Sequence, residues 1–510
     1  MFIPLNFLLL PAAFFVSLAV CAFSALILLH PRISLSFVRI HVGLCGLPPL
    51  VALLSLVTNH GNGMFGPWRF DPLAWLTVLF VLTIGLIVQR YSVRYLLGDR
   101  HYRKYFALLT LTTGAVSVAW SSNDLRLLLA CWGATLLGLT LLIGLNREWQ
   151  VARTAAVLSG RLYALSWLVL LTALTWLAQV TGHWQLSLVF AKGGLAHLGS
   201  WERTGICLLL IVAVAIPAAQ WPFQRWLLDS VVAPTPVSAV MHAGLVNAGG
   251  ILLTRFAPLF NGGLSQVFLM VLSGISVLLG TGIILVQVDY KRQLVGSTIA
   301  QMGFMLIQCA LGAYLAAIIH AVLHGLFKSA LFLQAGSAIH HNQPKMGATP
   351  LSSFLWIMTG GVPGLLAGIG FWSIDNGGVY QWISALILVG SVWFAWIQLV
   401  AFGYGRIGRI AGISLLAGAA IVFGIVHDAF YGLLHETVRQ GIEPPTSAVV
   451  LVLFLLLSSG AIGVWVSRRH SAPFAVLYLW LVRLGETHRD LVESHPKHLG
   501  FSLSQGGSKR

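Results

Sequence analysis

Apolar runs of about the length of a membrane span follow one another along almost the whole chain, separated by short polar stretches. A helix needs roughly 20 apolar residues to cross about 30 Å of hydrocarbon, and backbone in lipid has to satisfy its hydrogen bonds internally. The pattern therefore predicts an all-α polytopic membrane protein with about 15 transmembrane helices. They are expected near residues 4–29, 38–57, 72–89, 105–121, 125–145, 155–180, 204–224, 236–259, 266–288, 294–311, 313–337, 350–373, 380–404, 408–427 and 446–467.

The composition supports the same class of protein. Of the 510 residues, 57% are hydrophobic and 9% are charged, whereas about a quarter of a soluble domain is charged. The first apolar run, from Phe7 to Leu29, has no basic leader and no small-residue cleavage site, so it is expected to remain as a span. The five cysteines lie in apolar runs without CxxC spacing, which favours neither a disulfide framework nor a metal site.

The formal net charge of +16 comes from basic residues at the ends of the predicted helices. If alternate loops face the cytoplasm, one side receives Arg32, Arg39, Arg90, Arg94, Arg100, Arg103, Lys104, Arg147, Arg153, Lys291, Arg292, Lys345, Arg406 and Arg409. The positive-inside rule then places the N-terminus outside and the C-terminus inside, which explains the charge without nucleic-acid binding. Arg161 and Arg255 fall near the ends of spans, where their side chains are expected to snorkel to the surface.

No predicted loop is long enough to hold a soluble catalytic domain. We therefore expect no catalytic centre and no cofactor in the chain itself, so that any hydrolytic, redox or ligase chemistry needs a partner. The tail after Trp465 contains FAVLYLWLVRLGETHRDLVESH, an apolar stretch followed by a charged one. This order favours a helix that lies in the membrane interface or docks on a subunit over a sixteenth span.

Two apolar helices carry helix breakers, in AIPAAQWPFQRW (215–226) and GGVPGLLAGIGFWSIDNGG (360–378). Both helices are expected to break partway through the bilayer, with a simple kink at each proline as the alternative. Paired broken helices indicate a transporter built from inverted repeats, here of five helices each. We expect N-terminal helices at 1–103, repeats at 104–260 and 261–405, C-terminal helices at 406–467 and a cytoplasmic tail with an amphipathic helix at 468–510.

The segment DSVVAPTPVSAVMHAGLVN, which begins at Asp229, predicts a joint between two helices. Each proline pushes the residue before it towards extended geometry, and Ser238 can then cap the next helix. Arg225 and Asp229 are four residues apart and can form a salt bridge on one helix face, with a direct part in transport as the alternative. His242 follows the joint without an acid nearby in the sequence, so it is either a transport residue or a buried histidine satisfied by a carbonyl group.

The segment AIIHAVLHGLFKSALF places His320, His324 and Lys328 four residues apart. At about 100° per residue each step turns by only about 40° and rises by about 6 Å, so the three side chains share one stripe of an otherwise apolar helix. Imidazole and a desolvated amine can both exchange protons near neutral pH, so the stripe is suited to carry protons through single waters. A polar seam between helices is one alternative. A zinc site is the other, and it is disfavoured because no intramembrane Glu or Cys lies nearby.

Several of these segments resemble signatures of the antiporter-like subunits shared by respiratory complex I, the Mrp sodium/proton antiporters and their relatives. They are FDPLAWLTVLFVLTIGLIVQRYSVRYL, AQWPFQRWLLDSVVAPTPVSAVMHAGLVNAGGILLTRF, DYKRQLVGSTIAQMGFM and HAVLHGLFKSALFLQAGS. The resemblance implies that His242, His320, His324 and Lys328 lie on the central hydrophilic axis of that fold and carry protons. Arg225, Asp229 and Asp375 are accessory candidates.

Three positions depart from the complex I pattern. Gly133 stands where those subunits have an acidic residue, Pro217 where they have a lysine, and Ile374 where they have a second lysine, beside Asp375. As a short, acid-depleted member of this family, the chain resembles the membrane subunit of the bacterial DAB inorganic-carbon accumulation complex. The partner in that complex, DabA, is a cytoplasmic zinc protein similar to β-carbonic anhydrase. This resemblance implies a bacterial inner-membrane protein that passes protons or sodium ions and thereby drives its partner to hydrate carbon dioxide to bicarbonate.

Two other functions stay open. One is a proton-translocating subunit of an NADH-quinone oxidoreductase or of an Mrp-type Na⁺/H⁺ antiporter, and the missing groups at Gly133 and Pro217 argue against it. The other is a structural membrane anchor with a dead channel, and the intact stripe of His320, His324 and Lys328 argues against that.

Overall fold

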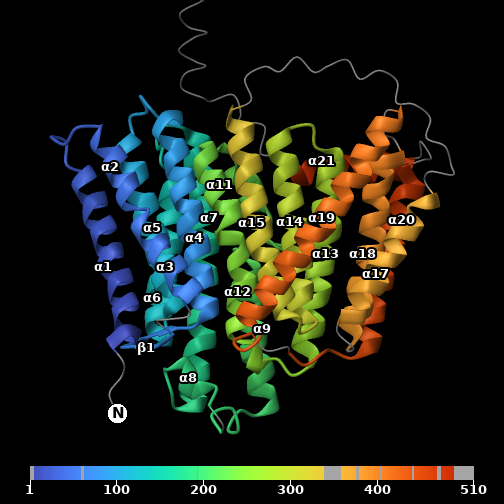
Figure 1. Cartoon of the computed structure of the whole chain (residues 1–510), viewed down its shortest axis with the longest axis horizontal. Coiled ribbons are helices and arrows are strands. Elements are labelled where there is room, and N and C mark those ends of the chain that lie inside the picture. The colour runs from blue at the N-terminus through green and yellow to red at the C-terminus, as the bar shows by residue number, and fades with distance from the viewer. Residues whose placement is uncertain are drawn as a thin grey trace, which may run out of the picture.

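Helices that stand side by side make up almost all of the protein (Figure 1). The structure, a computed structural model, describes residues 5–58, 62–191, 193–337, 358–374, 378–401, 405–438, 441–467 and 472–486. The first half of the chain forms α1 (Leu5–Leu28), α2 (Phe37–Leu44), α3 (Leu47–Thr58), β1 (Gly63–Phe65), β2 (Trp68–Phe70), α4 (Pro72–Tyr95), α5 (Tyr102–Ser121), α6 (Leu125–Ile143), α7 (Gln150–Thr181), α8 (Leu186–Val189), α9 (Ser200–Ala215), α10 (Arg225–Asp229), η1 (Ser230–Val232), α11 (Thr235–Ala243), η2 (Leu245–Asn247) and α12 (Ala248–Arg255). The second half forms η3 (Ala257–Leu259), α13 (Leu264–Val286), α14 (Tyr290–Ala310), α15 (Tyr314–Ser337), α17 (Gly361–Ile374), α18 (Gly378–Trp396), the π-helical η4 (Ile397–Ala401), α19 (Gly405–Leu434), α20 (Thr446–Ser467) and α21 (Ala472–Gly485).

Nine helices of the described ranges are long and apolar enough to cross a membrane. They are Leu9–Leu28, Phe37–Thr58, Pro72–Tyr95, Leu125–Ile143, Gln150–Thr181, Thr235–Arg255, Leu264–Val286, Tyr314–Ala335 and Ile407–Leu434. Together with the helical content, they confirm the predicted all-α polytopic membrane protein. The expected number of about 15 spans stays a prediction, as does the division into two five-helix repeats.

Acidic side chains mark the start of three long helices. Asp71, Asp124 and Asp289 each accept hydrogen bonds from backbone N–H groups in the first turn of α4, α6 and α14. Such N-caps satisfy N–H groups that have no partner within the helix. A chain with only 14 acidic residues thus uses three of them to define where helices begin.

A short antiparallel hairpin precedes α4 at the end of the bundle where the N-terminus lies (Figure 1). The register of β1 and β2 pairs Gly63 with Phe70, Met64 with Arg69 and Phe65 with Trp68. Gly66 makes the turn with a φ of 60°, in the left-handed region that glycine adopts without steric cost.

The first predicted helix break is confirmed. α9 ends at Ala215 and α10 begins at Arg225, and the residues between them, all described, form turns. Pro217 lacks the N–H that a continuing helix needs, and Ala219 has a φ of 52°, a left-handed conformation that interrupts a right-handed helix.

In the second segment with helix breakers, the helix is interrupted at Gly360, and no break occurs at Pro363. Met358 and Thr359 are helical and Gly360 forms a turn, after which α17 runs without interruption through Pro363. Proline is tolerated there because it falls in the first turn of α17, where N–H groups have no helical partner. Asp375, which was expected in this segment, lies outside the described residues.

The joint between α10 and α11 is confirmed, but the predicted cap is wrong. Ala233 and Pro234 are extended, with ψ angles of 150° and 141°, and α11 begins at Thr235. Ser238 therefore lies inside α11, where its hydroxyl donates to the carbonyl oxygen of Ala233 at 3.5 Å. The helix begins earlier than expected because Pro236 is well suited to a first helical turn.

In Figure 1, α11, α12 and α15 lie in the middle of the bundle, between the N-terminal helices and α17 to α20. α15 packs against α4, α11, α12 and α14. The single turn η2 separates α11 from α12, so another helix interruption faces α15. Gly325 permits this close packing, because a Cβ atom there would lie 2.6 Å from the carbonyl oxygen of Ala243 and 3.0 Å from the amide nitrogen of Asn247.

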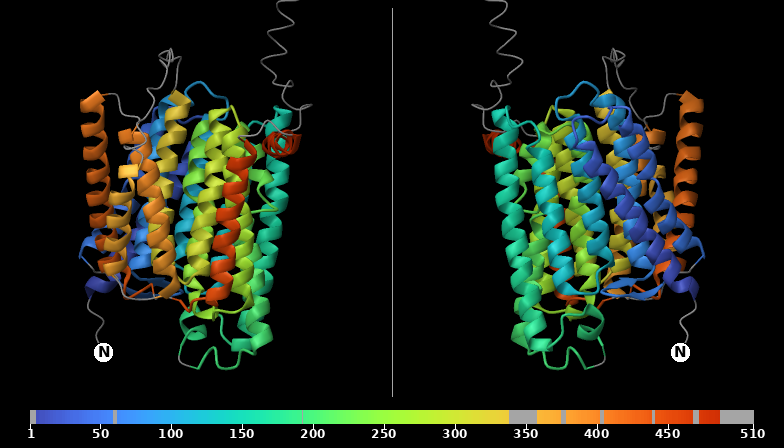
Figure 2. Two further views of the ribbon diagram at one scale, coloured as in Figure 1. Left: turned by 90° about the vertical axis from the view of Figure 1, so that its right-hand side faces the viewer. Right: turned by 90° about the vertical axis from the view of Figure 1, so that its left-hand side faces the viewer.

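The short helix α21 lies across the long helices, near the end of the bundle opposite the N-terminus (Figures 1 and 2). It packs on α13 and α20, with Leu481 against Gly282. Val476, Leu479 and Trp480 remain exposed. This placement supports the prediction of an interfacial helix and speaks against a sixteenth span.

Candidate functional site

α15 carries His320, His324 and Lys328 on one face in the middle of the bundle. The helix is continuous from Tyr314 to Ser337, so the four-residue spacing places the three side chains in a row, as the sequence predicts. Lys328 is 2% exposed and His324 is 7% exposed, while His320 is partly buried. These groups are therefore largely removed from water.

His320 begins the row at the end nearer the start of α15. Its Nδ1 atom forms a hydrogen bond of 3.2 Å with Oε1 of Gln308, on α14. The centroids of the His320 and His324 rings are 6.2 Å apart, with an interplanar angle of 60°. This separation is too long for a direct hydrogen bond between the rings, so proton exchange between them would need a bridging water.

His324 has no hydrogen-bond partner for either ring nitrogen among the described residues. Buried polar atoms in proteins are almost always paired with protein or with ordered water. An imidazole with two unpartnered nitrogens costs the fold stability unless water reaches it. His324 is therefore the position in the row where water is most strongly required.

Lys328 is held by the backbone and not by an acid. Its Nζ atom donates a hydrogen bond of 3.1 Å to the carbonyl oxygen of Leu294, on α14. No carboxylate of the described residues forms an ion pair with it. The lysine thus has a fixed position and, within the part of the chain that the structure describes, no neutralising partner.

His242 joins the row through Thr298. The Thr298 hydroxyl donates to the carbonyl oxygen of Leu294 at 2.9 Å, so towards Nδ1 of His242, 3.1 Å away, it acts as an acceptor. In the neutral ring the proton is then on Nδ1, and the unpartnered Nε2 is the acceptor. Since Leu294 also accepts from Lys328, one carbonyl group connects His242 with the row on α15.

Phe332 extends the same stripe of α15 by four residues. Its ring stacks on that of His242, with centroids 4.2 Å apart and an interplanar angle of 19°. His242 and Phe332 are both fully buried. The stacking fixes the plane of the imidazole, so its orientation does not depend on Thr298 alone.

The accessory candidates are placed as follows. Arg225 Nε and Asp229 Oδ2 are 3.5 Å apart within α10, which confirms the predicted salt bridge. Asp375 lies outside the described residues. Gly133, which stands where complex I subunits have an acid, faces the indole of Trp167, and a Cβ atom there would lie 2.7 Å from Nε1 of that ring. Trp167 therefore fills the space that a longer side chain at this position would need.

The expectation that Arg255 snorkels to the surface is wrong. Arg255, at the end of α12, donates to both carboxylate oxygens of Asp71, at 2.5 and 2.9 Å, and both side chains are mostly buried. Burial alone would raise the pKa of Asp71, but Arg255 and the hydrogen bond from Ala74 hold that pKa below its usual range. The sequence could not reveal this pair, because the two residues are 184 positions apart.

His41 is a second buried histidine, and the sequence did not single it out. Its Nδ1 lies 2.8 Å from Oγ of Ser24 and its Nε2 lies 2.9 Å from Oγ1 of Thr110. Both ring nitrogens are therefore satisfied, in contrast to those of His324. His41 acts as a polar link between α1, α2 and α5.

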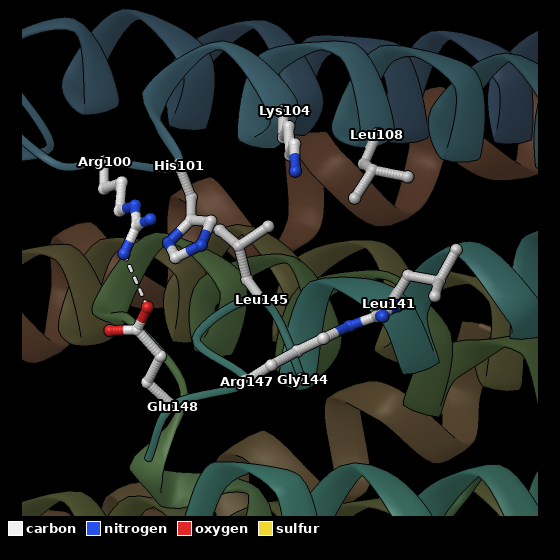
Figure 3. Close-up of a pocket in the computed structure, with 9 residues that line it drawn as sticks. All are labelled: Arg100, His101, Lys104, Leu108, Leu141, Gly144, Leu145, Arg147 and Glu148. Atoms are coloured by element: carbon white, nitrogen blue, oxygen red, sulfur yellow. Dashed lines mark hydrogen bonds and ion pairs between the residues drawn. The ribbon is translucent and has the colours of Figure 1, made fainter.

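Two pockets lie next to each other where α4 ends and α5 begins. The first, of about 450 Å³, has a mainly basic rim (Figure 3), and its lining includes Arg100, His101, Lys104, Arg147, Glu148 and three leucines. The second, of about 600 Å³, is lined among others by Tyr95, Asp99, Glu148 and Pro234. Arg100 donates to Glu148 at 2.5 Å, and Glu148 borders both pockets.

Comparison with known proteins extends the sequence resemblance. Residues 122–408 match the family model described as NADH:quinone oxidoreductase/Mrp antiporter, TM, and residues 67–106 match the model of the N-terminus of complex I chain 5. The chain is 61% identical over 492 residues to the "Probable inorganic carbon transporter subunit DabB" of Bacillus subtilis (strain 168), which covers 96% of this chain and 97% of that protein. It is 58% identical over 496 residues to the protein of the same name from Bacillus anthracis, which covers 97% of each.

A solved structure shares the fold. A chain in the structure of the Mrp complex from Dietzia sp. DQ12-45-1b superimposes with a TM-score of 0.65, at 24% identity, over 98% of this chain and 60% of that chain. At this level of identity the similarity shows the arrangement of the helices alone.

Proposed function

The chain belongs to the DabB family of inorganic carbon transporter subunits, within the NADH:quinone oxidoreductase/Mrp antiporter membrane proteins, and on this premise we propose that it conducts protons that drive inorganic-carbon uptake. The protons would move down their gradient along His242, His320, His324 and Lys328. A cytoplasmic partner resembling a zinc-dependent carbonic anhydrase (DabA-like) would use this flow to hydrate carbon dioxide to bicarbonate in one direction.

One observation carries the proposal. His324 and Lys328 are adjacent in a buried row, one without any hydrogen-bond partner in the described structure and the other without an acid. Intramembrane ionisable groups are costly, and a purely structural seam would have its polar atoms paired. A group that exchanges protons with water needs a donor or acceptor atom that is not already paired with protein. The two ring nitrogens of His324 are such atoms among the described residues, and the amine of Lys328 has more donors than its one hydrogen bond uses.

The chemistry of the row favours protons over sodium ions. Its ionisable members are three imidazoles and one amine, which take up protons, whereas alkali and alkaline-earth cations prefer oxygen ligands such as carboxylates. The described neighbours that supply oxygen are the carbonyl of Leu294, the hydroxyl of Thr298 and the amide of Gln308. A cationic lysine in the same row would also repel sodium.

The distribution of charge supports the orientation. Basic loops gather at the end of the bundle where α4 ends and α5 begins, and the positive-inside rule assigns that end to the cytoplasm of a bacterium. The N-terminus, at the other end in Figure 1, would then be outside and the C-terminal tail inside. The partner would then form bicarbonate next to the end of the bundle that carries the basic loops.

A subunit of an NADH-quinone oxidoreductase or of an Mrp-type antiporter is the alternative. It is disfavoured because the acid and the lysine expected for gating are replaced by Gly133 and Pro217, and Trp167 occupies the space beside Gly133. In our proposal the gating belongs to the partner instead.

Purification of the chain with its native neighbours tests the proposed function. We expect a soluble zinc protein to co-purify in stoichiometric amount, detected by mass spectrometry and by metal analysis. The complex should also convert carbon dioxide to bicarbonate in one direction only when a proton gradient is imposed. Co-purification with iron–sulfur or flavin subunits would contradict the proposal and support a respiratory role.

A further inference from the structure

A series of hydrogen-bonded polar groups lies between the Lys328 end of the row on α15 and the end of the bundle where the basic loops gather. Lys291 Nζ donates to Oγ1 of Thr235 at 3.0 Å, and the hydroxyl of Tyr95 donates to the same oxygen at 3.1 Å. Thr235 is 1% exposed, whereas Tyr95 is 41% exposed. The three groups thus connect a buried position with the surface through α14, α11 and α4.

Lys291 lies close to the end of the proposed relay. It is in the first turn of α14, three residues before Leu294, whose carbonyl oxygen accepts from Lys328. One helical turn, about 5 Å along the axis, separates the two positions on α14. Transfer between the two amines would run through water, because neither donates to the other.

The series of polar groups formed by Lys291, Thr235 and Tyr95 ends at the surface in the 600 Å³ pocket, which differs from the neighbouring pocket in the charged residues that line it. The 600 Å³ pocket is lined by Tyr95 and by Pro234, which precedes Thr235, and its lining includes the carboxylates of Asp99 and Glu148. None of the described residues that line it is lysine, arginine or histidine, although the neighbouring pocket contains four such residues. Glu148 accepts from Arg100, and Asp99 lies 3.6 Å from Nδ1 of His101. The two carboxylates thus offset basic side chains of the neighbouring pocket, and without them the mouth would repel cations.

We infer that this pocket is the cytoplasmic mouth of the proton pathway and that Tyr95, Thr235 and Lys291 carry protons between it and Lys328. The inference rests on the proposed function, because it needs Lys328 to exchange protons. In each transfer one proton moves from a protonated donor to a neutral acceptor, and no other bond is made or broken. The Lys328 ammonium passes its proton through water to the Lys291 amine, and Lys291 then releases that proton through Thr235 and Tyr95 to the pocket, in the inward direction of the proposed flow.

The test measures proton flux through the complex with its native partner in proteoliposomes that contain a pH-sensitive dye. The variants are Tyr95→Phe, which keeps the ring, Thr235→Val, and Lys291→Met. The matched control is Tyr91→Phe, the same change on the residue that stacks on Tyr95 at 5.3 Å but does not line the pocket. We expect roughly tenfold slower flux for each of the three variants and an unchanged rate for the control.

Two further measurements separate proton transfer from a structural role. Imidazole added on the cytoplasmic face should restore flux in Lys291→Met, because a mobile base can enter the pocket, and it should have no effect from the other face. The double variant Asp99→Asn/Glu148→Gln should slow flux at low ionic strength and lose that effect at high salt, where the surface potential is screened.

The outcomes distinguish this inference from the proposed function. If Lys328→Met abolishes flux while Tyr95→Phe, Thr235→Val and Lys291→Met all retain the wild-type rate, the mouth lies elsewhere and the inference is wrong. If Lys328→Met itself retains the wild-type rate, the proposed function fails. A lowered flux in Lys291→Met that imidazole does not restore would assign a structural role to Lys291 and overturn the inference.

Discussion

Lys328 and Leu294 form the contact on which the candidate site is built, a hydrogen bond of 3.1 Å from the lysine Nζ atom to a backbone carbonyl oxygen. The same carbonyl accepts the Thr298 hydroxyl, which in turn accepts from His242. A carbonyl group cannot neutralise an ammonium, so none of the described residues that hold the lysine locks it into the charged form.

Replacing His324 should separate function from stability. We expect His324→Leu to abolish proton flux while the thermal unfolding temperature stays the same or rises, because two unpartnered buried nitrogens are removed. His41→Leu is the matched control, since both nitrogens of that ring are paired. It should destabilise the protein by about 1 to 3 kcal/mol. Equal destabilisation by the two changes would contradict the assignment.

Removing the hydroxyl of Thr298 should affect His242 without changing the shape of the site. Thr298→Val deletes the group that accepts from Nδ1 of His242, while the stacking on Phe332 remains. We expect flux to fall several-fold and its pH dependence to shift, because the preferred tautomer of the ring is no longer fixed. Thr298→Ser, which keeps the hydroxyl, should stay near the wild-type rate. A pH profile that is identical in Thr298→Val and wild type would show that His242 is not part of the relay.

The ion pair of Asp71 and Arg255 should contribute to stability in a pH-dependent way. Asp71→Asn keeps an oxygen for capping α4 but leaves Arg255 unpaired in a mostly buried position, so we expect a loss of about 3 to 5 kcal/mol at neutral pH. Since the pKa of Asp71 is lowered in the folded protein, this contribution is fully present above its ordinary value of 3.8 and is lost as the pH falls through the lower native value.

The measurement is the thermal unfolding temperature of wild type and variant in detergent as a function of pH. The difference between them should be constant near neutrality and shrink below about pH 4. The double variant Asp71→Asn/Arg255→Met should recover part of the loss, because no buried charge is then left unpaired; Arg69, the second partner of Asp71 at 3.5 Å, is exposed to water. A difference that does not depend on pH would contradict the pairing.

The sequence was sufficient for features that depend on local pattern. The length of the apolar runs predicts the helices, and the four-residue spacing predicts the shared face of His320, His324 and Lys328. The break at Pro217 also follows from a single residue type. Ser238 was assigned wrongly because two local signals competed, and the proline at position 236 determined where the helix begins.

Features that depend on contacts between distant segments could not be predicted. The link from His242 to Thr298 spans 56 positions and that from Lys328 to Leu294 spans 34. The pair of Asp71 and Arg255 spans 184 positions. Each of these contacts depends on how the helices pack against one another. Most residues of an apolar helix are chemically alike, so the sequence does not show which residue of another helix each of them contacts.

Restoring the acid found in complex I subunits should not restore a respiratory gate. We expect Gly133→Glu to destabilise the protein, because even a Cβ atom there would lie 2.7 Å from the indole nitrogen of Trp167. Gly133→Ala should destabilise it in the same direction, by about 1 to 3 kcal/mol. The measurement is the unfolding temperature of both variants. A stable Gly133→Glu variant with wild-type flux would mean that Trp167 moves aside freely.

The most direct measurement is proton flux in Lys328→Met, in the complex with its native partner reconstituted into vesicles with an imposed pH gradient. The variant keeps an apolar stem of similar length but cannot bind a proton, and subunit stoichiometry after purification reports whether assembly is intact. We predict an assembled complex whose proton flux and gradient-driven formation of bicarbonate from carbon dioxide both fall to background. An assembled complex that moves protons at the wild-type rate would contradict the account.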